Sequence, residues 1–260
     1  MSALARLRVE PSAVGGVMLR NWVVFRRNWR GNAVSSMLDP VVSLLAFGFG
    51  FGALVTTVAG VPYLQYVGTG IVAQTLLFSS IFPAMFETYF RRTYQHLYDA
   101  LLAAPVDPVD VATGEAAFLG AKAGVFAMAP LSVAVAFGLD PAPGMVLVPL
   151  IGMLTGFGCA CLGIFISALA NDFSAFDYVI SMLVTPLFLF AGSFFPLAGL
   201  PGWVNAVAHV NPLFHTVELV RHAVFGLQPA TDAGHVAVLV AFALLAWWLA
   251  CWRTERRLIG

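Results

Sequence analysis

The sequence predicts an all-α integral membrane protein with six transmembrane helices. Of the 260 residues, 60% are hydrophobic and only 10% are charged, whereas soluble domains are about half apolar and about a quarter charged. Several apolar runs also reach the roughly 20 residues that cross a bilayer as a helix. These runs lack the alternation of polar and apolar residues that a membrane β-barrel would show.

The apolar runs place the expected spans at about residues 37–57, 63–87, 111–137, 145–169, 176–195 and 235–252. Gly152 and Gly156 are four residues apart in the fourth span, a spacing that favours close helix packing. Residues 196–234 are apolar but are interrupted by several prolines. Because proline breaks helices, this region predicts short re-entrant helices at the outer membrane face before the last span.

Residues 1–36 are expected to form a cytoplasmic tail and an amphipathic interfacial helix, before a transmembrane domain over residues 37–260. The stretch from about Val14 to Ser36 alternates aromatic and basic side chains, including Trp22, Phe25, Arg26, Arg27 and Trp29. Such a helix lies in the membrane interface, with aromatic rings in contact with lipid and arginines toward water. Attachment to a membrane domain disfavours nucleic acid as its ligand. The N-terminus has no apolar stretch before a cleavage site, so no removable signal peptide is expected.

The arginines predict the orientation of the chain. Six precede the first expected span, two follow the second and three follow the last, whereas the opposite face has only Arg221. Positively charged loops remain in the cytoplasm. A bacterial inner-membrane protein with both termini in the cytoplasm is therefore expected.

The stretch between the second and third spans differs from the rest of the chain. Its apolar side chains recur at three- and four-residue spacing and would form one face of a short helix: Tyr94, Leu97, Tyr98, Leu101 and Leu102. Pro105 and Pro108 would end that helix. Two interpretations stay open, a helix that docks on another protein and a helix that lies on the lipid surface.

Few residues suggest chemistry. Lys122 is the only lysine, and its surroundings lack the spacing and the following Ser or Thr of a phosphate-binding loop. His215, Glu218 and His222 share a helix face, but neighbouring Arg221 would repel a metal cation, so a polar surface face is favoured. The three cysteines, at positions 159, 161 and 251, have no metal-site spacing and are expected in the core.

Lys122 would lie inside the third span, where a charged group is costly unless it pairs or reaches water. Glu115 lies two turns earlier on the same face, and Glu87 lies near the end of the second span. These residues would form either a structural ion pair or part of a substrate path.

Four segments carry a family resemblance. Residues 98–106, followed by Gly114 and Glu115, resemble the cytoplasmic loop of type-2 ABC exporter permeases. Residues 211–221, with Asn211, Pro212, Glu218 and Arg221, resemble the motif before their last span. Residues 170–173 and 186–196 match as well. The nearest branch resembles the nodulation-factor exporter permeases, which are implicated in moving lipo-chitooligosaccharides out of rhizobia.

The resemblance implies a homodimeric permease that binds two copies of a separate ABC ATPase, which holds the ATP and Mg. The helix after the second span would be the coupling helix, and the N-terminal helix would help in gating and docking. This chain would bind no cofactor, would not be an enzyme, and would export an amphipathic lipo-oligosaccharide or glycolipid. The alternatives are a drug-exporting permease of the same family, a membrane-embedded lipid-modifying enzyme, and a secondary transporter with inverted repeats.

Overall fold

Four long helices form the centre of the computed structural model, which describes residues 9–58, 60–102, 106–197 and 201–259. They are α3 (Tyr63–Thr93), α5 (Pro108–Phe126), α7 (Val148–Leu169) and α12 (Pro229–Ile259). A short helix, α6 (Met128–Ala136), extends α5, and a 3-10 turn, η3 (Pro143–Leu147), leads into α7. Within the described ranges, four helical segments are long and apolar enough to cross a membrane: Tyr63–Thr93, Pro108–Ala136, Pro143–Leu169 and Pro229–Leu258. The chain is therefore a mainly α-helical, multi-pass membrane protein, and four of the six expected spans are confirmed as helices of spanning length.

The other two expected spans are built differently. Residues 37–57 fall in α2 (Trp29–Ser43), in the π-helix η2 (Leu44–Phe51), in the turn that follows and in the first residue of β1 (Thr57–Val58). Residues 176–195 fall in α8 (Ser174–Val179), the π-helix η4 (Ile180–Val184) and α9 (Thr185–Leu189). The resulting apolar helix, Ser174–Leu189, is about 24 Å long at 1.5 Å per residue, shorter than the roughly 30 Å hydrocarbon core of a bilayer.

The helix that covers the fifth expected span ends at Leu189, where the chain turns, and does not reach residue 195. Gly192 has a φ of +72°, a conformation that side-chain-bearing residues rarely adopt. Its carbonyl accepts hydrogen bonds from Tyr66 and Arg221. Two distant parts of the chain therefore hold residues 190–195 in a turn.

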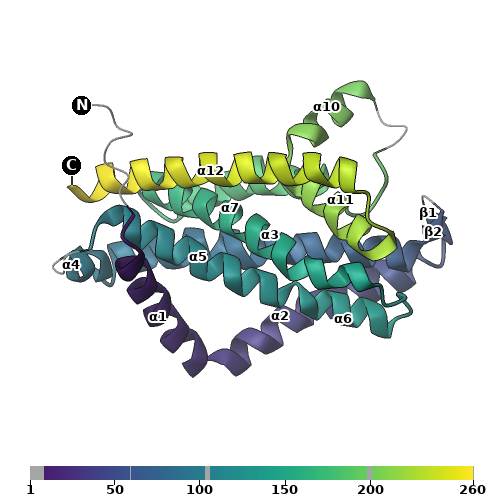
Figure 1. The fold of residues 1–260 in the computed structure, drawn as a ribbon, viewed down its shortest axis with the longest axis horizontal. Coiled ribbons are helices and arrows are strands. Elements are labelled where there is room, and N and C mark those ends of the chain that lie inside the picture. Colours follow the sequence, from purple (N-terminus) through teal and green to yellow (C-terminus); the bar gives the residue numbers. More distant parts are fainter. Residues whose placement is uncertain (1–8, 59, 103–105, 198–200, 260) are drawn as a thin grey trace.

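The N-terminal region forms two helices where the sequence predicted one. Helix α1 (Pro11–Arg27) and α2 meet at Asn28 and form a V on one side of the bundle (Figure 1). Asn28 has a non-helical conformation, and its amide donates to the carbonyl of Phe25. Helix α2 runs without a break past residues 36 and 37, and the domain boundary expected there remains a prediction. Trp22 and Trp29 are exposed, and Phe25 is half-buried; the interfacial position of this region remains a prediction.

Glycines allow α5 and α7 to pack closely. A Cβ atom added at Gly156 would lie 2.6 Å from the Cβ of Ala123 and 3.2 Å from the Cα of Gly120. One added at Gly152 would lie 2.9 Å from the Cα of Gly124. The packing role predicted for Gly152 and Gly156 is thus confirmed. The three cysteines are free and buried, as the sequence also predicted.

Two short helices precede α12, as expected from the prolines. Helix α11 (Pro212–Phe225) packs against α3, α7 and α12. Helix α10 (Gly202–Val210) projects from the bundle, and its Trp203 is exposed (Figure 1). Whether α10 enters the membrane remains a prediction.

Figure 1 shows that the two ends of the bundle differ. The start of α1, the end of α12 and the short helix α4 (Leu97–Leu102) lie at one end, which we call the α4 end. The hairpin of β1 (Thr57–Val58) and β2 (Val61–Pro62) lies at the opposite end, the hairpin end. If the long helices cross the membrane, these ends lie in different compartments.

This arrangement predicts the outcome of thiol labelling. Asp140 lies in the turn between α6 and η3, and Arg256 lies near the end of α12. In a variant lacking the three native cysteines, Asp140→Cys should react with an impermeant reagent added outside. Arg256→Cys should react only after the membrane is opened. Labelling of both positions from the same side, or the reverse pattern, would contradict this topology.

Candidate functional site

The α4 helix follows a break in the chain and does not continue from α3. Helix α3 ends at Thr93, and His96 has a positive φ of 51° before α4 begins at Leu97. The continuous helix predicted from Tyr94 to Leu102 is therefore wrong. Tyr94 instead belongs to an aromatic cluster at the end of α3, where it stacks on Phe90 and on Phe173 of the α7–α8 turn.

The apolar face of α4 turns partly into the protein. Tyr98 is 1% exposed and forms a small core with Val17 of α1 and Val111 of α5. Leu101 packs against the same core, and Leu97 is half-buried. The side chain of Leu102 lies outside the described residues. Tyr98 and Leu101 therefore face the protein and attach α4 to α1 and α5.

A buried carboxylate lies beneath α4. Glu115 of α5 has a side chain that is 1% exposed, and a buried charge is costly unless it is paired and hydrogen-bonded. Its Oε1 atom forms ion pairs with Arg20 of α1 at 3.0 Å and with Arg91 of α3 at 3.4 Å. Its Oε2 atom accepts hydrogen bonds from the Tyr98 hydroxyl at 2.6 Å and from the Thr88 hydroxyl at 3.2 Å. We call these five residues the Glu115 cluster.

The Tyr98 hydroxyl acts as a donor in this cluster. Burial raises the pKa of the Tyr98 phenol well above its ordinary value, and the neighbouring Glu115 carboxylate raises it further. The phenol therefore keeps its proton at physiological pH and donates a hydrogen bond to the carboxylate. Such a charge-assisted hydrogen bond is stronger than one between neutral groups. The Glu115 cluster thus connects four helices, α1, α3, α4 and α5.

The ion pair expected between Lys122 and Glu115 or Glu87 is not formed. Glu115 binds the two arginines, and Glu87 pairs with Arg91 at 2.6 Å. Within the described part of the chain, the Lys122 ammonium lies over the ring of Phe126, 5.4 Å from its centroid, and the Glu87 charge acts on it from beyond ion-pair distance. The spacing of Lys122 and Glu115 places them on one helix face, but the Glu115 carboxylate pairs instead with arginines from two other helices.

A groove of about 720 Å³ opens beside the Glu115 cluster, between α1 and α3. Its lining combines aromatic, apolar and charged side chains: Arg20, Asn21, Val24, Phe86, Glu87, Phe90, Arg91, Gln95, Leu97 and Phe173. This size lies within the range of small-molecule sites. The mixed lining can accommodate a molecule that has both an apolar and a polar part.

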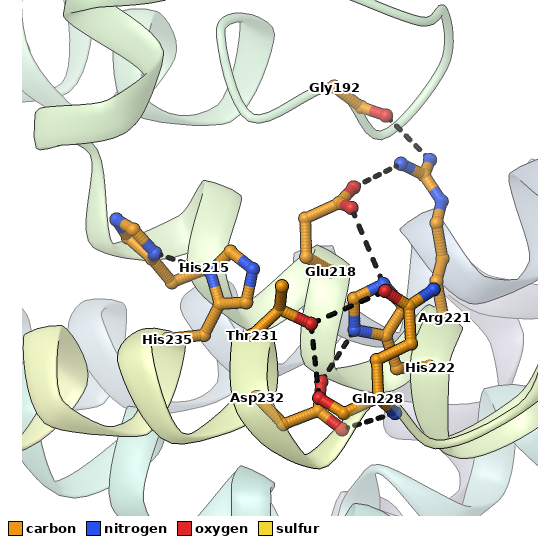
Figure 2. A network of polar contacts seen from close by, with 9 residues as sticks. All are labelled: Gly192, His215, Glu218, Arg221, His222, Gln228, Thr231, Asp232 and His235. Atoms are coloured by element: carbon orange, nitrogen blue, oxygen red, sulfur yellow. Dashed lines mark hydrogen bonds and ion pairs between the residues drawn. The ribbon is translucent and has the colours of Figure 1, made fainter.

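A second polar cluster lies near the start of α12 and includes the motif expected before the last span. Asn211 caps α11, because its side chain accepts a hydrogen bond from the Leu213 amide at 2.9 Å, and Pro212 occupies the first turn. Arg221 pairs with Glu218 at 3.0 Å and donates to the Gly192 carbonyl at 2.6 Å (Figure 2). Its guanidinium also lies over the Tyr66 ring, 3.8 Å from the centroid. The motif therefore joins α11 to α3 and to the turn after α9.

The histidines of α11 pair with residues of α12. His222 pairs with Asp232, with 2.5 Å between Nδ1 and Oδ1, and His215 shares a hydrogen bond with His235 at 2.7 Å (Figure 2). Among the described residues, no group of three or more histidine, cysteine or acidic side chains is placed to hold a metal ion. These contacts fasten α12 to α11.

Comparison with known proteins supports the resemblance seen in the sequence. The family model for ABC-2 type transporters matches residues 13–225. The chain belongs to the ABC-2 type transporter family.

Individual relatives agree with this family assignment. The chain is 31% identical to Nodulation protein J of Sinorhizobium fredii over 248 residues, covering 92% of this chain and 95% of the relative. It is 29% identical to Nodulation protein J of Rhizobium meliloti, with 92% and 94% covered. It is also 24% identical to the Inner membrane transport permease YadH of Escherichia coli, with 90% of each chain covered. The protein is therefore a transmembrane ABC transporter permease, and its family implies an ATPase partner.

Arg20 and Thr88 were not predicted as site residues from the sequence. Arg20 was counted with the basic residues that mark orientation, and Thr88 is an unremarkable polar residue in an apolar helix. A pattern that could have singled out Arg20 is its position one helical turn after Val17, which places it on the α1 face that meets α5. The partner, however, lies 95 residues away, so spacing alone could not identify it.

The Glu115 cluster predicts an order of stabilities. Glu115→Gln leaves two arginines without their shared counter-charge and should destabilise the protein by about 3–5 kcal/mol. Tyr98→Phe removes one hydrogen bond to a charged group and should cost about 1.5–3 kcal/mol. Glu87→Gln removes a half-exposed partner of the same Arg91 and should cost less than about 1 kcal/mol.

Thermal unfolding of the purified variants in detergent measures this order. The melting temperature should fall most for Glu115→Gln, less for Tyr98→Phe and least for Glu87→Gln. Equal melting temperatures for Glu115→Gln and Glu87→Gln would show that the buried carboxylate does not hold the α4 end together.

Proposed function

We propose that this permease exports an amphipathic lipo-oligosaccharide or glycolipid across the bacterial inner membrane, using ATP hydrolysed with Mg by a separate ABC ATPase. The relatives named Nodulation protein J and the resemblance to nodulation-factor exporter permeases support this substrate class. The arginine distribution supports an orientation in which the α4 end is cytoplasmic. The working unit in this proposal is a permease homodimer with two ATPase subunits.

The observation that carries the proposal is the attachment of α4 to the membrane helices. Tyr98 and Leu101 seat α4 on α1 and α5, and the Tyr98 hydroxyl binds the Glu115 carboxylate. That carboxylate also binds α1 and α3 through Arg20 and Arg91. A displacement of α4 by an ATPase would therefore pull directly on three helices. In this proposal α4 is the coupling helix, and the inward residues transmit the movement.

The groove beside the Glu115 cluster supports the substrate class. Its aromatic side chains, Phe86, Phe90 and Phe173, suit an apolar chain or the face of a sugar ring. Its polar side chains include Arg91 and Gln95, which can donate hydrogen bonds to a sugar headgroup. Because α1 and α3 form its walls, movement of α4 would change its width.

The position of Tyr98 changes which residues should meet the ATPase. Tyr98 and Leu101 face inward, so replacing them would disturb folding as well as docking. Ala100 is exposed on α4, and Tyr94 is exposed shortly before it. We therefore assign the contact with the ATPase to this outward side.

The corresponding variant is Ala100→Glu. A charged side chain at the centre of the contact should weaken binding, because a change at a hot spot costs about 2 kcal/mol or more. Less ABC ATPase should co-purify with this variant than with the wild-type chain. Substrate-stimulated ATP hydrolysis should fall at least 10-fold. Ala206→Glu, on the exposed surface of α10, is the matched control and should behave like wild type.

Proteoliposomes that contain the permease and its ATPase provide the measurement. Lipo-oligosaccharide should stimulate hydrolysis more than hydrophobic drugs do, and Ala100→Glu should abolish that stimulation while its melting temperature stays unchanged. If lipo-oligosaccharide stimulates ATP hydrolysis normally in Ala100→Glu, α4 is not the coupling helix. Stimulation by drugs alone would instead identify a drug exporter.

A further inference from the structure

A second groove lies between α1 and α5, apart from the groove beside α3. Its walls come from one face of each helix, with residues at three- and four-residue spacing. The α1 side consists of Gly15, Met18, Leu19, Trp22 and Phe25, and the α5 side of Phe118, Ala121, Lys122, Val125 and Phe126. The groove has a volume of about 540 Å³. Its lining is apolar except for Lys122.

Contacts on either side of the groove fix its shape. Val17 lies against Gly114, where an added Cβ would be only 2.8 Å from the Val17 Cβ, and Arg20 pairs with Glu115. Farther along α1, the ring of Phe25 meets Phe118 and Phe126 at centroid distances of 6.2 and 6.0 Å. Between these contacts α1 and α5 do not close, and Leu19, Trp22 and Val125 remain more than half exposed. The groove is therefore held open by the packing of the protein itself.

No carboxylate lines this groove beside Lys122, and within the described residues the Glu87 charge acts on the ammonium only from beyond ion-pair distance. The Lys122 ammonium lies 5.4 Å from the centroid of the Phe126 ring. The two acidic residues expected to neutralise it, Glu115 and Glu87, are paired with Arg20 and Arg91. In apolar surroundings a lone ammonium is costly, and an anion brought by a ligand would lower that cost.

We propose that this groove binds a phospholipid with a net negative headgroup. One acyl chain lies along the aromatic and aliphatic side chains of α1 and α5, and the headgroup phosphate accepts a hydrogen bond from the Lys122 ammonium. The aromatic side chains of α1, the helix expected to be interfacial, suit the boundary between headgroups and acyl chains, and Lys122 of α5 lines the same groove. A zwitterionic lipid carries its own ammonium group and has less need of Lys122, so the charge of Lys122 favours the anionic lipid.

The test compares phosphatidylglycerol and phosphatidylethanolamine with identical acyl chains. Binding of each lipid to the purified full chain is titrated by native mass spectrometry. Wild type should bind phosphatidylglycerol at least 10-fold more tightly. Lys122→Gln should lose this preference and Lys122→Arg should retain it. Ala121→Trp, which fills the groove, should weaken both lipids. Melting temperatures close to wild type establish that the variants are folded.

Arg26→Gln is the control for general electrostatic attraction, because Arg26 is exposed on α1 and does not line the groove. It should bind phosphatidylglycerol as wild type does. Equal affinity of wild type for the two lipids would overturn the proposal. An unchanged preference in Lys122→Gln, or equal losses in Lys122→Gln and Arg26→Gln, would overturn it as well. Displacement of the lipid by millimolar inorganic phosphate would show that the site binds a free anion and would also contradict a lipid site.

Discussion

The burial of the Glu115 carboxylate is the constraint on which the α4 end depends. A carboxylate that is 1% exposed is tolerated only where donors and counter-charges surround it. Here they come from three other helices: Arg20 on α1, Arg91 and Thr88 on α3, and Tyr98 on α4. If α1 or α4 left the bundle, the Glu115 carboxylate would become exposed or would lose a hydrogen-bond or ion-pair partner. The six-residue helix α4 and the N-terminal helix α1 are therefore tied to the bundle by this charge in addition to their hydrophobic contacts.

A comparable arrangement of polar contacts holds the chain near the start of α12. Arg221 donates to the Gly192 carbonyl and lies over Tyr66, and Tyr66 donates to the same carbonyl. Helix α3 takes part in both arrangements, because Tyr66 lies near its first residue and Arg91 near its last. Movement of α3 would therefore change the contacts both in the Glu115 cluster and at the turn after α9. This continuous helix is the physical connection between the two sets of contacts.

Much of the fold follows from the sequence, because long apolar runs and glycine spacing reflect local rules. Four spans and the packing of Gly152 and Gly156 were predicted in this way. The break at Asn28 and the turn at Gly192 were not, since the latter depends on Tyr66 and Arg221, far away in sequence. The site was predicted less well. Periodicity identified the apolar face of α4 but could not show that α1 and α5 pack against it. Tyr98 therefore faces the protein and not a partner. Likewise, spacing suggested Lys122 as the partner of Glu115, whereas Arg20 comes from a separate helix.

The most direct test of this account is a double-mutant cycle between α1 and α4. Arg20 binds one oxygen of Glu115 and Tyr98 binds the other. The unfolding free energies of Arg20→Gln, Tyr98→Phe and the double variant should therefore be non-additive by about 0.5–3 kcal/mol. The coupling should disappear when the cycle is repeated in Glu115→Gln. Additive effects with Glu115 present, or the same coupling without its charge, would contradict the role assigned to this carboxylate.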